Sequence, residues 1–498
     1  MNRRLTVCAF LALVLLVPAR HAAASYGIYV GRNLTADGSV LLGGTGDEVS
    51  SHWLEIVPRR AHADGETIAV GVDDKATYPG RFIDIPEVTE TAKYITMNYS
   101  DYEGFPAPLT NGGLNEYGVA ARDIWSPSRP ELARMTPAPQ TGPNYSDLSR
   151  IAMERAHSAR EAVEIIGRLM DEYGYSTYGG NSHLFADTEE GWVVINFAGG
   201  QGLWIAQRLG PDEVRMSYPG YILEIPTDFQ DRPDYMGSDN FISFAVAQGW
   251  YDPQSGEPFN VNEIYGNGNG RSEPVRIIEA RLHAKAAAGG VTLRDMMASV
   301  RDPMISSDTN GYGQVAHIRP GLPHEELKML WVAPTGSVTA PFVPYWIGGS
   351  VVLPEFGKHR YLTKGEATRF VTPEFAIQEA SLFAGRLFKR LMYYTCDAPD
   401  LFLDEVTRAL TAFEDQSINA RDGVEAHALA LYRAGEPAMA RGVFDDYTSS
   451  RARAALDLGN ALLASIEARH RLLVGASPPA DLDTISARRG PNVTCLAN

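Results

Sequence analysis

The chain has 498 residues and a formal net charge of −17, with 44% hydrophobic and 21% charged residues. This composition is typical of a soluble globular protein with one large core or two ordinary ones. Its excess of negative charge disfavours nucleic acid and anionic membranes as partners, because both repel an acidic surface.

The N-terminus has the pattern of an export signal. Arg3 and Arg4 precede the apolar run "LTVCAFLALVLLV", and Ala22–Ala24 provides small residues for cleavage after Ala24. This run is too short for a comfortable membrane span, and no other segment approaches the necessary length. We therefore expect residues 1–24 to be a signal peptide, and the remaining protein to be periplasmic or extracellular with no membrane span.

Strands, then helices, then strands are predicted over the next two hundred residues. The runs "YGIYVG", "SVLLGG", "HWLEIVPR" and "KYITMNY" are strand-like, and "GGLNEYGVAARDIW" predicts a turn and a strand. Residues 145–171 have helical periodicity, with Ser146 or Asp147 as the first cap and Ser158 and Glu161 as a capping box. "NSHLFADTEEGWVVINF" predicts a hairpin, and two more strands follow it. This order favours an α+β domain.

The second half of the chain is predicted to be loop-rich and then helical. Residues 226–360 are rich in Gly, Pro and Asn, and "YGNGNGRSEP" predicts a loop that no helix follows. Helical patterns run from Pro373 to about residue 472, and the last residues look like a loosely held tail. Cys396 and Cys495 form either one disulfide or two free thiols.

Cleavage after Ala24 would make Ser25 the N-terminal residue and a candidate nucleophile. As the first residue, Ser25 would carry both a hydroxyl and a free α-amino group, and an α-amine has a pKa of about 8. The residue would then hold its own nucleophile and its own base, as N-terminal-nucleophile hydrolases do. The chain contains neither G-x-S-x-G nor H-E-x-x-H, which argues against an α/β-hydrolase or a zinc peptidase.

Several short motifs after Ser25 occur in the order found in one known family. They are Val30-Gly31-Arg32, Asp37-Gly38-Ser39, "NGGLNEYGVA", "GGNSHLFADTEEGWVV", "GLWIAQRLGPDEV" and "APFVPYWIGG". Together they resemble the dipeptidase A (PepD-type) family of the N-terminal-nucleophile hydrolase clan. The resemblance runs from residue 25 to about residue 420.

The resemblance implies a fold and an activity. The implied fold is a four-layer αββα sandwich with the nucleophile at the end of a central strand. The implied activity is hydrolysis of dipeptides or related amides, with a small peptide or amide as the partner and with no metal or other cofactor. From the resemblance together with the leader and the helical patterns, we expect four parts: the signal peptide 1–24, a hydrolase domain 25–365, a helical region 366–475 packed on it, and a tail 476–498. Whether the helical region is a separate domain stays open. Whether the protein forms a homo-oligomer stays open.

The sequence departs from the family pattern at three places. Ser25 stands where the family usually has cysteine, and an Arg-Asn-Asp/Glu-Asp run is reduced to Gly44-Thr45-Gly46-Asp47. The segment "SYPGYI" also has no asparagine where relatives often place an oxyanion donor. These departures leave two alternatives to a dipeptidase: an amidase that acts on acyl-amino acids, and an inactive binding protein with the same fold.

Candidate site residues follow from their chemistry and their place in these motifs. Asp47 is predicted to accept a hydrogen bond from the Ser25 ammonium or to bind a substrate amine. Asn111, Asn115 and Asn181 are candidate donors to a tetrahedral oxyanion, and the guanidinium groups of Arg122 and Arg208 are candidates for binding a substrate carboxylate. The alternatives are turn residues and surface ion pairs. His183 is predicted to be a strand residue with a local hydrogen bond.

Overall fold

The computed structural model describes residues 25–46, 52–101, 104–217, 222–358, 382–474 and 493–496. The predicted signal peptide and Asp47 therefore lie outside the described residues, as does the boundary predicted between residues 365 and 366.

One antiparallel sheet has six strands and contains the segment that follows Ser25. Its order is β15 (Val214–Ser217), β1 (Tyr26–Val30), β2 (Val40–Gly46), β19 (Tyr312–Ile318), β20 (Met329–Ala333) and β21 (Val343–Trp346). The predicted turn at Asp37 and Gly38 joins β1 to β2, and Gly38 has φ 73°. The short helix η1 (Arg32–Leu34) lies in the same connection.

A second antiparallel sheet has nine strands. Its order is β17 (Tyr235–Gly237), β14 (Trp204–Leu209), β13 (Gly191–Asn196), β12 (Asn181–Ala186), β11 (Ala120–Trp125), β10 (Gly112–Asn115), β8 (Tyr94–Tyr99) and β3 (His52–Val57), with β9 (Leu109–Thr110) paired to β8. The predicted hairpin 180–197 is confirmed as β12 and β13. The two sheets pack face to face, with β11 against β1 and β2.

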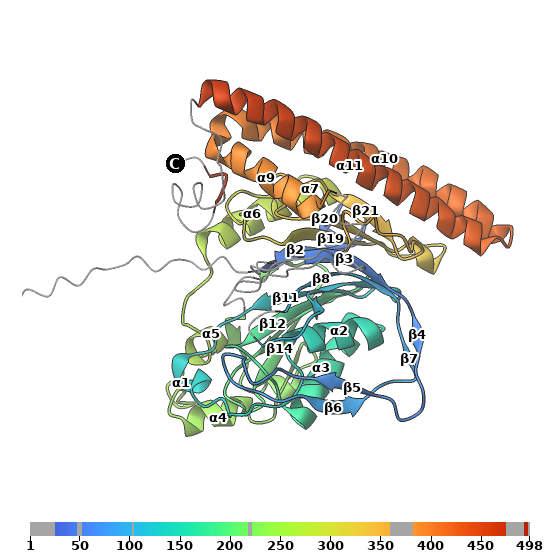
Figure 1. Cartoon of the computed structure of the whole chain (residues 1–498). Helices are drawn as coiled ribbons and strands as arrows, with labels where there is room; N and C mark the ends of the chain where they lie inside the picture. The colour runs from blue at the N-terminus through green and yellow to red at the C-terminus, as the bar shows by residue number, and fades with distance from the viewer. Residues whose placement is uncertain are drawn as a thin grey trace, which may run out of the picture.

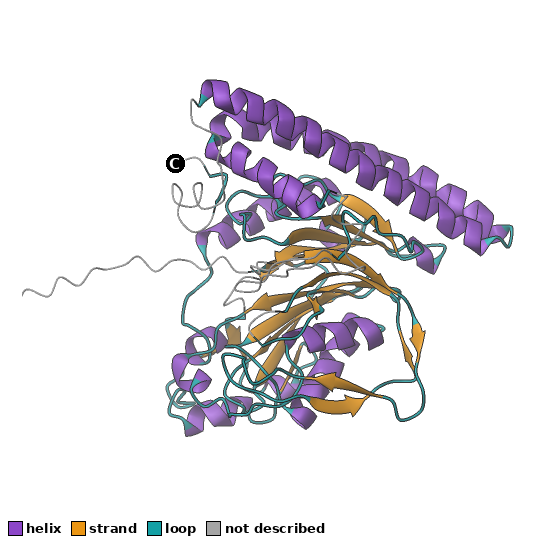
Figure 2. Ribbon diagram, viewed as in Figure 1, coloured by secondary structure: helices purple, strands orange, loops and turns teal. Residues whose placement is uncertain are grey.

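Helices cover the outer face of each sheet. α2 (Tyr145–Arg155) and α3 (Ala159–Tyr173) lie on the nine-stranded sheet, whereas α6 (Glu273–Ala287) and α7 (Leu293–Val300) lie on the six-stranded sheet. Figures 1 and 2 show the resulting order of helix, sheet, sheet and helix. The protein is thus an α+β protein, and its layers are those of the predicted αββα sandwich.

The helix caps differ in detail from those predicted. Asn144 caps α2 and forms a capping box with Asp147, so the cap lies before the residues proposed for it. The Ser158 hydroxyl caps α3 by accepting from the Glu161 N–H at 3.1 Å, as predicted. The Glu161 carboxylate, however, accepts from the His157 N–H at 2.8 Å and does not complete the box.

The prediction that no helix follows "YGNGNGRSEP" is wrong, because α6 begins at Glu273. Pro274 is compatible with a first helical turn. The buried stripe of α6 has only three apolar members, Val275, Ile278 and Leu282, so its periodic signal is weak.

Short elements complete the connections between the layers. The helices are α1 (Pro130–Ala133), α4 (Phe241–Ala247), α5 (Val261–Ile264), η2 (Phe229–Asp231) and η3 (Glu325–Leu327). The strands pair as β4 (Arg60–Ala61) with β7 (Glu90–Thr91), β5 (Thr67–Val70) with β6 (Ile83–Pro86), and β16 (Glu224–Ile225) with β18 (Phe259–Asn260).

Three C-terminal helices pack outside the six-stranded sheet. They are α9 (Ala384–Asp397), α10 (Pro399–Arg433) and α11 (Pro437–Leu473), and the last two form a long hairpin across the top of Figure 1. Trp346 of β21 stacks on Phe444 of α11, with ring centroids 5.4 Å apart. None of the helices in the described ranges is both long and apolar enough to cross a bilayer.

One buried and one partly buried ion pair hold α10 against the sandwich. Glu414 accepts from both terminal nitrogens of Arg301 at 2.9 and 2.5 Å, and Glu425 accepts from both terminal nitrogens of Arg319 at 2.8 and 2.7 Å. The two glutamates are eleven residues apart, or about three helical turns, so both carboxylates lie on one side of α10. The helical region therefore docks through specific contacts in addition to apolar packing.

A disulfide joins Cys396 of α9 to Cys495. Thr494 also pairs with Ser307, and the Asp308 carboxylate accepts from the Val493 N–H at 2.8 Å. Of the two alternatives left open for the cysteines, the structure has the disulfide. Residues 493–496, which belong to the predicted loose tail, are therefore held against the body of the protein.

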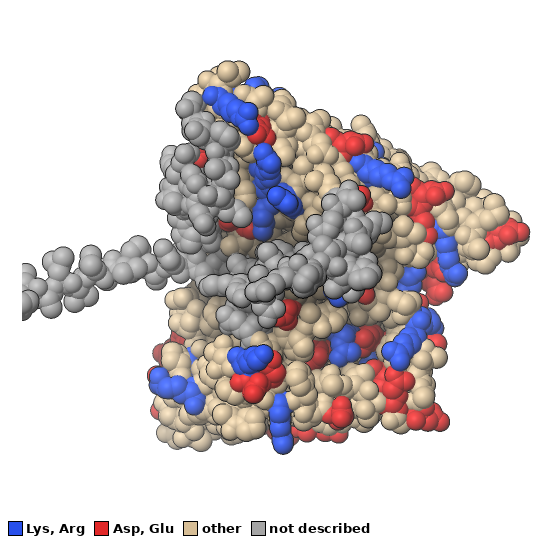
Figure 3. Space-filling model, viewed as in Figure 1, with Lys and Arg blue, Asp and Glu red and all other residues tan. Residues whose placement is uncertain are grey.

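Acidic and basic side chains are interspersed on the face shown in Figure 3. Many of the arginines form ion pairs with neighbouring carboxylates, as Arg441 does with Glu326 at 2.7 Å. Charges of both signs therefore lie close together on this face.

Candidate active site

Ser25 lies at the start of β1, where the two sheets face each other. The residue is 5% exposed and is followed by Tyr26, which pairs with Thr45 of β2. Gly27 pairs with Gly44 on one side and with Ser217 on the other. Because side chains alternate along a strand and cross-strand pairs share a face, Ser25 and Ser217 face the nine-stranded sheet together.

Glycines make room between the sheets beside Ser25. A Cβ atom on Gly27 would lie 2.9 Å from Leu184 Cδ2 and 3.6 Å from Arg122 Cβ. A Cβ atom on Gly44 would lie 2.2 Å from the Tyr26 carbonyl oxygen and 3.2 Å from Arg122 Nε. The missing side chain at Gly44 therefore makes room for the Arg122 guanidinium, and the missing side chain at Gly27 makes room for Leu184.

Arg122 is fully buried on β11 and joins the two sheets at this point. Its guanidinium donates to the Thr45 carbonyl at 2.5 Å, to the Asn111 carbonyl at 2.8 Å and to the hydroxyl of Tyr312. The Tyr312 ring centroid lies 5.1 Å from the Arg122 Cζ atom. The predicted capture of a substrate carboxylate by Arg122 stays a prediction, since both terminal nitrogens already bind protein acceptors.

Asn111 and Asn115 have different surroundings. The Asn111 amide donates to the Asp123 carboxylate at 2.7 Å, next to Arg122. The Asn115 amide donates to two carbonyls at the end of α2 at 2.8 and 3.1 Å, and its oxygen accepts from the Tyr117 and Val119 N–H groups. Asn115 thus fastens the turn after β10 to α2, and the oxyanion role predicted for it would require breaking these bonds.

Asn181 belongs to the other face of the nine-stranded sheet. It alternates in step with His183 and Phe185, and Phe185 packs in the core beneath α2 and α3. Leu184, of opposite parity, packs between the sheets. The structure therefore does not bring the Asn181 side chain to the face that Ser25 and Arg122 share.

His183 matches the prediction of a strand residue with a local hydrogen bond. Its Nδ1 atom lies 3.3 Å from the Ser149 hydroxyl on α2. Burial, with a smaller contribution from the charge of Arg122, lowers the pKa of His183 to about 3. This imidazole is accordingly neutral at physiological pH.

Arg208 lies at the far end of the sandwich from Ser25. It forms ion pairs with Glu190 and, at 3.1 Å, with Asp234, and its side chain is 37% exposed. The neighbouring Leu209 carbonyl accepts from the Tyr29 hydroxyl at 3.4 Å, near the C-terminal end of β1. The structure thus gives Arg208 surface ion pairs and separates it from the site at which it was predicted to bind substrate.

Comparison with known proteins matches residues 24–275 to the model of peptidase family C69. The chain belongs to peptidase family C69. It is 28% identical over 247 residues to a probable dipeptidase of Salmonella dublin, covering 49% of this chain and 53% of the relative. It is 29% identical over 233 residues to the probable dipeptidase B of Lactococcus lactis, covering 43% and 48%. The chain spans about half the length of the curated relatives it matches.

A solved structure of a conjugated bile acid hydrolase from Clostridium perfringens is also similar. It is 10% identical and covers 62% of this chain and 89% of its own, with a TM-score of 0.28. The fold of this member of family C69 is therefore argued from its own sheets and helices.

The region matched to family C69 contains most of the site but not all of it. Ser25, Arg122 and Ser217 lie within residues 24–275, whereas Tyr312 of β19 lies beyond them. Sequence reasoning did not find Ser217 or Tyr312. The hydroxyl of Ser217 stands at the end of a strand that was predicted, but only the pairing of that strand with β1 reveals its position.

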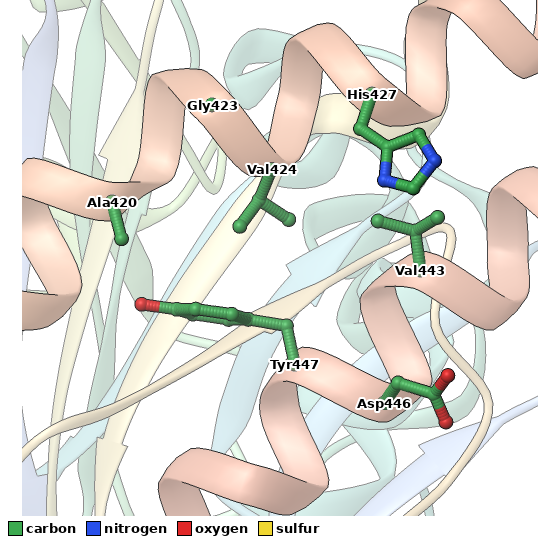
Figure 4. A pocket seen from close by; sticks show the side chains of 7 residues that line it. All are labelled: Ala420, Gly423, Val424, His427, Val443, Asp446 and Tyr447. Atoms are coloured by element: carbon green, nitrogen blue, oxygen red, sulfur yellow. The ribbon is translucent and has the colours of Figure 1, made fainter.

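Two other surface features lie apart from this site. Figure 4 shows a shallow groove between α10 and α11, lined by Ala420, Gly423, Val424, His427, Val443, Asp446 and Tyr447. A second groove lies between α3 and β17 and is lined mostly by charged side chains. Among the described residues, no group of three or more His, Cys, Asp or Glu is arranged to hold a metal ion.

Proposed function

We propose that this member of family C69 is an exported amide-bond hydrolase, most specifically a dipeptidase, with Ser25 as its nucleophile. The observation that carries the proposal is the position of Ser25. It is buried at the start of β1 and lies on the face that meets Arg122, in a region that belongs to a peptidase family. The curated relatives named as dipeptidases support the substrate class.

The proposed reaction uses the two groups of one residue. Ser25 Oγ attacks the scissile carbonyl carbon while its proton passes to the Ser25 α-amine, and the carbonyl electron pair moves onto oxygen. The oxyanion then collapses, the C–N bond breaks, and the ammonium gives its proton to the departing amine. Water attacks the resulting ester in the same way and releases the carboxylic acid and free Ser25. An α-amine pKa of about 8 suits both proton transfers near neutral pH.

Export is part of the proposal because the mechanism needs a free amine on Ser25. The N-terminal leader pattern supports it. The disulfide between Cys396 and Cys495 supports it independently, because disulfides form and persist in oxidising compartments.

The test combines the exported protein's N-terminal sequence with its turnover of a panel of dipeptides. We expect a chain that begins at Ser25 and hydrolyses dipeptides, and we expect Ser25→Ala to lose at least about a thousandfold in kcat. Ser39→Ala, in the turn before β2, is the matched control and should retain turnover. Equal turnover by Ser25→Ala and the wild-type protein would contradict the mechanism, and binding of dipeptides without turnover would favour the inactive binding protein.

A further inference from the structure

The Ser217 hydroxyl is buried and makes no hydrogen bond within the described part of the fold. Ser217 is the last residue of β15 and is fully buried. Buried polar atoms in native proteins almost always have partners, because leaving one unpaired opposes folding. An unpaired buried donor is therefore a candidate for contact with a ligand.

The hydroxyl lies beside the proposed nucleophile. Ser217 is directly opposite Gly27, two residues along β1 from Ser25, and all three positions face the nine-stranded sheet. Diagonal neighbours of this kind have Cα atoms about 7–8 Å apart, with their Cβ atoms somewhat closer. Gly27 has no side chain to stand between the two hydroxyls. A Cβ atom there would lie 2.9 Å from Leu184 Cδ2, so entry of a carbonyl group requires this flexible end of the Leu184 side chain to shift.

The end of β15 is held in place from outside the site. The Met216 N–H donates to Glu279 of α6 at 2.7 Å, and Arg271 donates to the Met216 carbonyl at 3.3 Å. Arg271 and Glu279 also form an ion pair with each other. A donor on a strand fixed in this way is preorganised, which is what stabilisation of a developing charge requires.

We propose that the Ser217 hydroxyl donates a hydrogen bond to the oxyanion that forms when Ser25 attacks a substrate carbonyl. The inference rests on the proposed function. In the attack, the Ser25 Oγ–carbon bond forms and the carbonyl π pair moves onto oxygen; Ser217 stabilises that charge and transfers no proton. Neither Asn115, which binds four backbone groups, nor Asn181, on the other face of the sheet, is positioned for this task.

The experiment compares Ser217→Ala and Ser217→Thr with Ser176→Ala on the dipeptides that the wild-type protein hydrolyses. Ser176 is the matched control, because its hydroxyl is also buried and unpaired among the described residues but lies in the connection after α3. We expect Ser217→Ala to lower kcat by about 10²–10³-fold with little change in KM. Ser217→Thr should restore most of the loss, and Ser176→Ala should retain wild-type kcat.

A peptide aldehyde makes the test independent of turnover. Its adduct with Ser25 carries the oxygen that Ser217 is proposed to bind, so Ser217→Ala should weaken aldehyde binding about as much as it lowers kcat. Product binding should not change. If Ser217→Ala hydrolyses dipeptides and binds the aldehyde like wild type while Ser25→Ala is inactive, the role of Ser217 is refuted and the proposed function stands. An active Ser25→Ala would instead refute the proposed function.

Discussion

The site around Ser25 and the docked helix α10 both contain buried polar groups, but these groups have hydrogen-bond partners in α10 and in part lack them around Ser25. In α10, Glu414 and Glu425 each form a bidentate ion pair with an arginine. Around Ser25, the Ser217 hydroxyl and Arg122 Nε lack partners among the described residues. Complete networks specify structure, whereas these unpaired donors lie where we propose that a substrate binds.

The largest expected effect is on the hairpin and is confined to stability. Glu414→Leu leaves the Arg301 guanidinium buried without its partner, which should lower the free energy of unfolding by about 3–5 kcal/mol. Urea unfolding measures this loss, and kcat/KM per folded molecule should stay at the wild-type value. The double variant Arg301→Met/Glu414→Leu should regain only part of the stability, because the Phe342 N–H and the Ser337 carbonyl lose their bonds to this pair. A single variant as stable as wild type would show that the pair does not hold α10.

A smaller effect on stability and kcat should distinguish substitutions between the two sheets from substitutions between the six-stranded sheet and α7. Gly27→Ala would place a methyl group 2.9 Å from Leu184 Cδ2, between the sheets, whereas Gly43→Ala would place one 2.8 Å from Met296 Sδ, under α7. Both should lower the free energy of unfolding by about 1–3 kcal/mol. Only Gly27→Ala should also lower kcat, by about 10–100-fold, because it pushes β1, and with it Ser25, away from the facing strands β11 and β12. Equal kcat losses in both variants would refute this distinction.

The smallest expected effect is a pH dependence from His183. Because burial lowers its pKa from 6.5 to about 3, the unfolded chain binds a proton that the folded protein does not. Stability is therefore fully present above pH 6.5 and falls as pH decreases toward 3, by about 1.4 kcal/mol at pH 5.5. His183→Gln removes this group and should flatten the unfolding free energy measured between pH 6.5 and 5.5. An unchanged slope would contradict the assignment.

Local patterns predicted much of the fold. The turn at Asp37 and Gly38, the cap at Ser158 and the hairpin of β12 and β13 each depend on a few neighbouring residues, and each is present. The helix α6 was missed because only three of its apolar residues form a buried stripe, and because it follows directly on a segment rich in Gly and Asn. The layers of the sandwich came from the ordered family motifs and not from periodicity.

The site was harder to predict because it depends on register between distant segments. Arg208 and Asn181 occur in motifs of the right kind, yet strand pairing places one at the far end of the sandwich and the other on the opposite face. Tyr312 shows the converse, since it lies in no motif but binds Arg122. Residue type suggests a chemistry, and only the alignment of strands decides which side chains meet.

The disulfide also makes a covalent ring of the C-terminal helices. Cys396 and Cys495 are 99 residues apart in the chain, and both long helices, with the exposed turn at Gly435, lie between them. A protease that nicks this turn once would therefore release nothing. The two fragments would migrate together on a gel until a reductant separated them, so loss of the hairpin requires two separate chemical events.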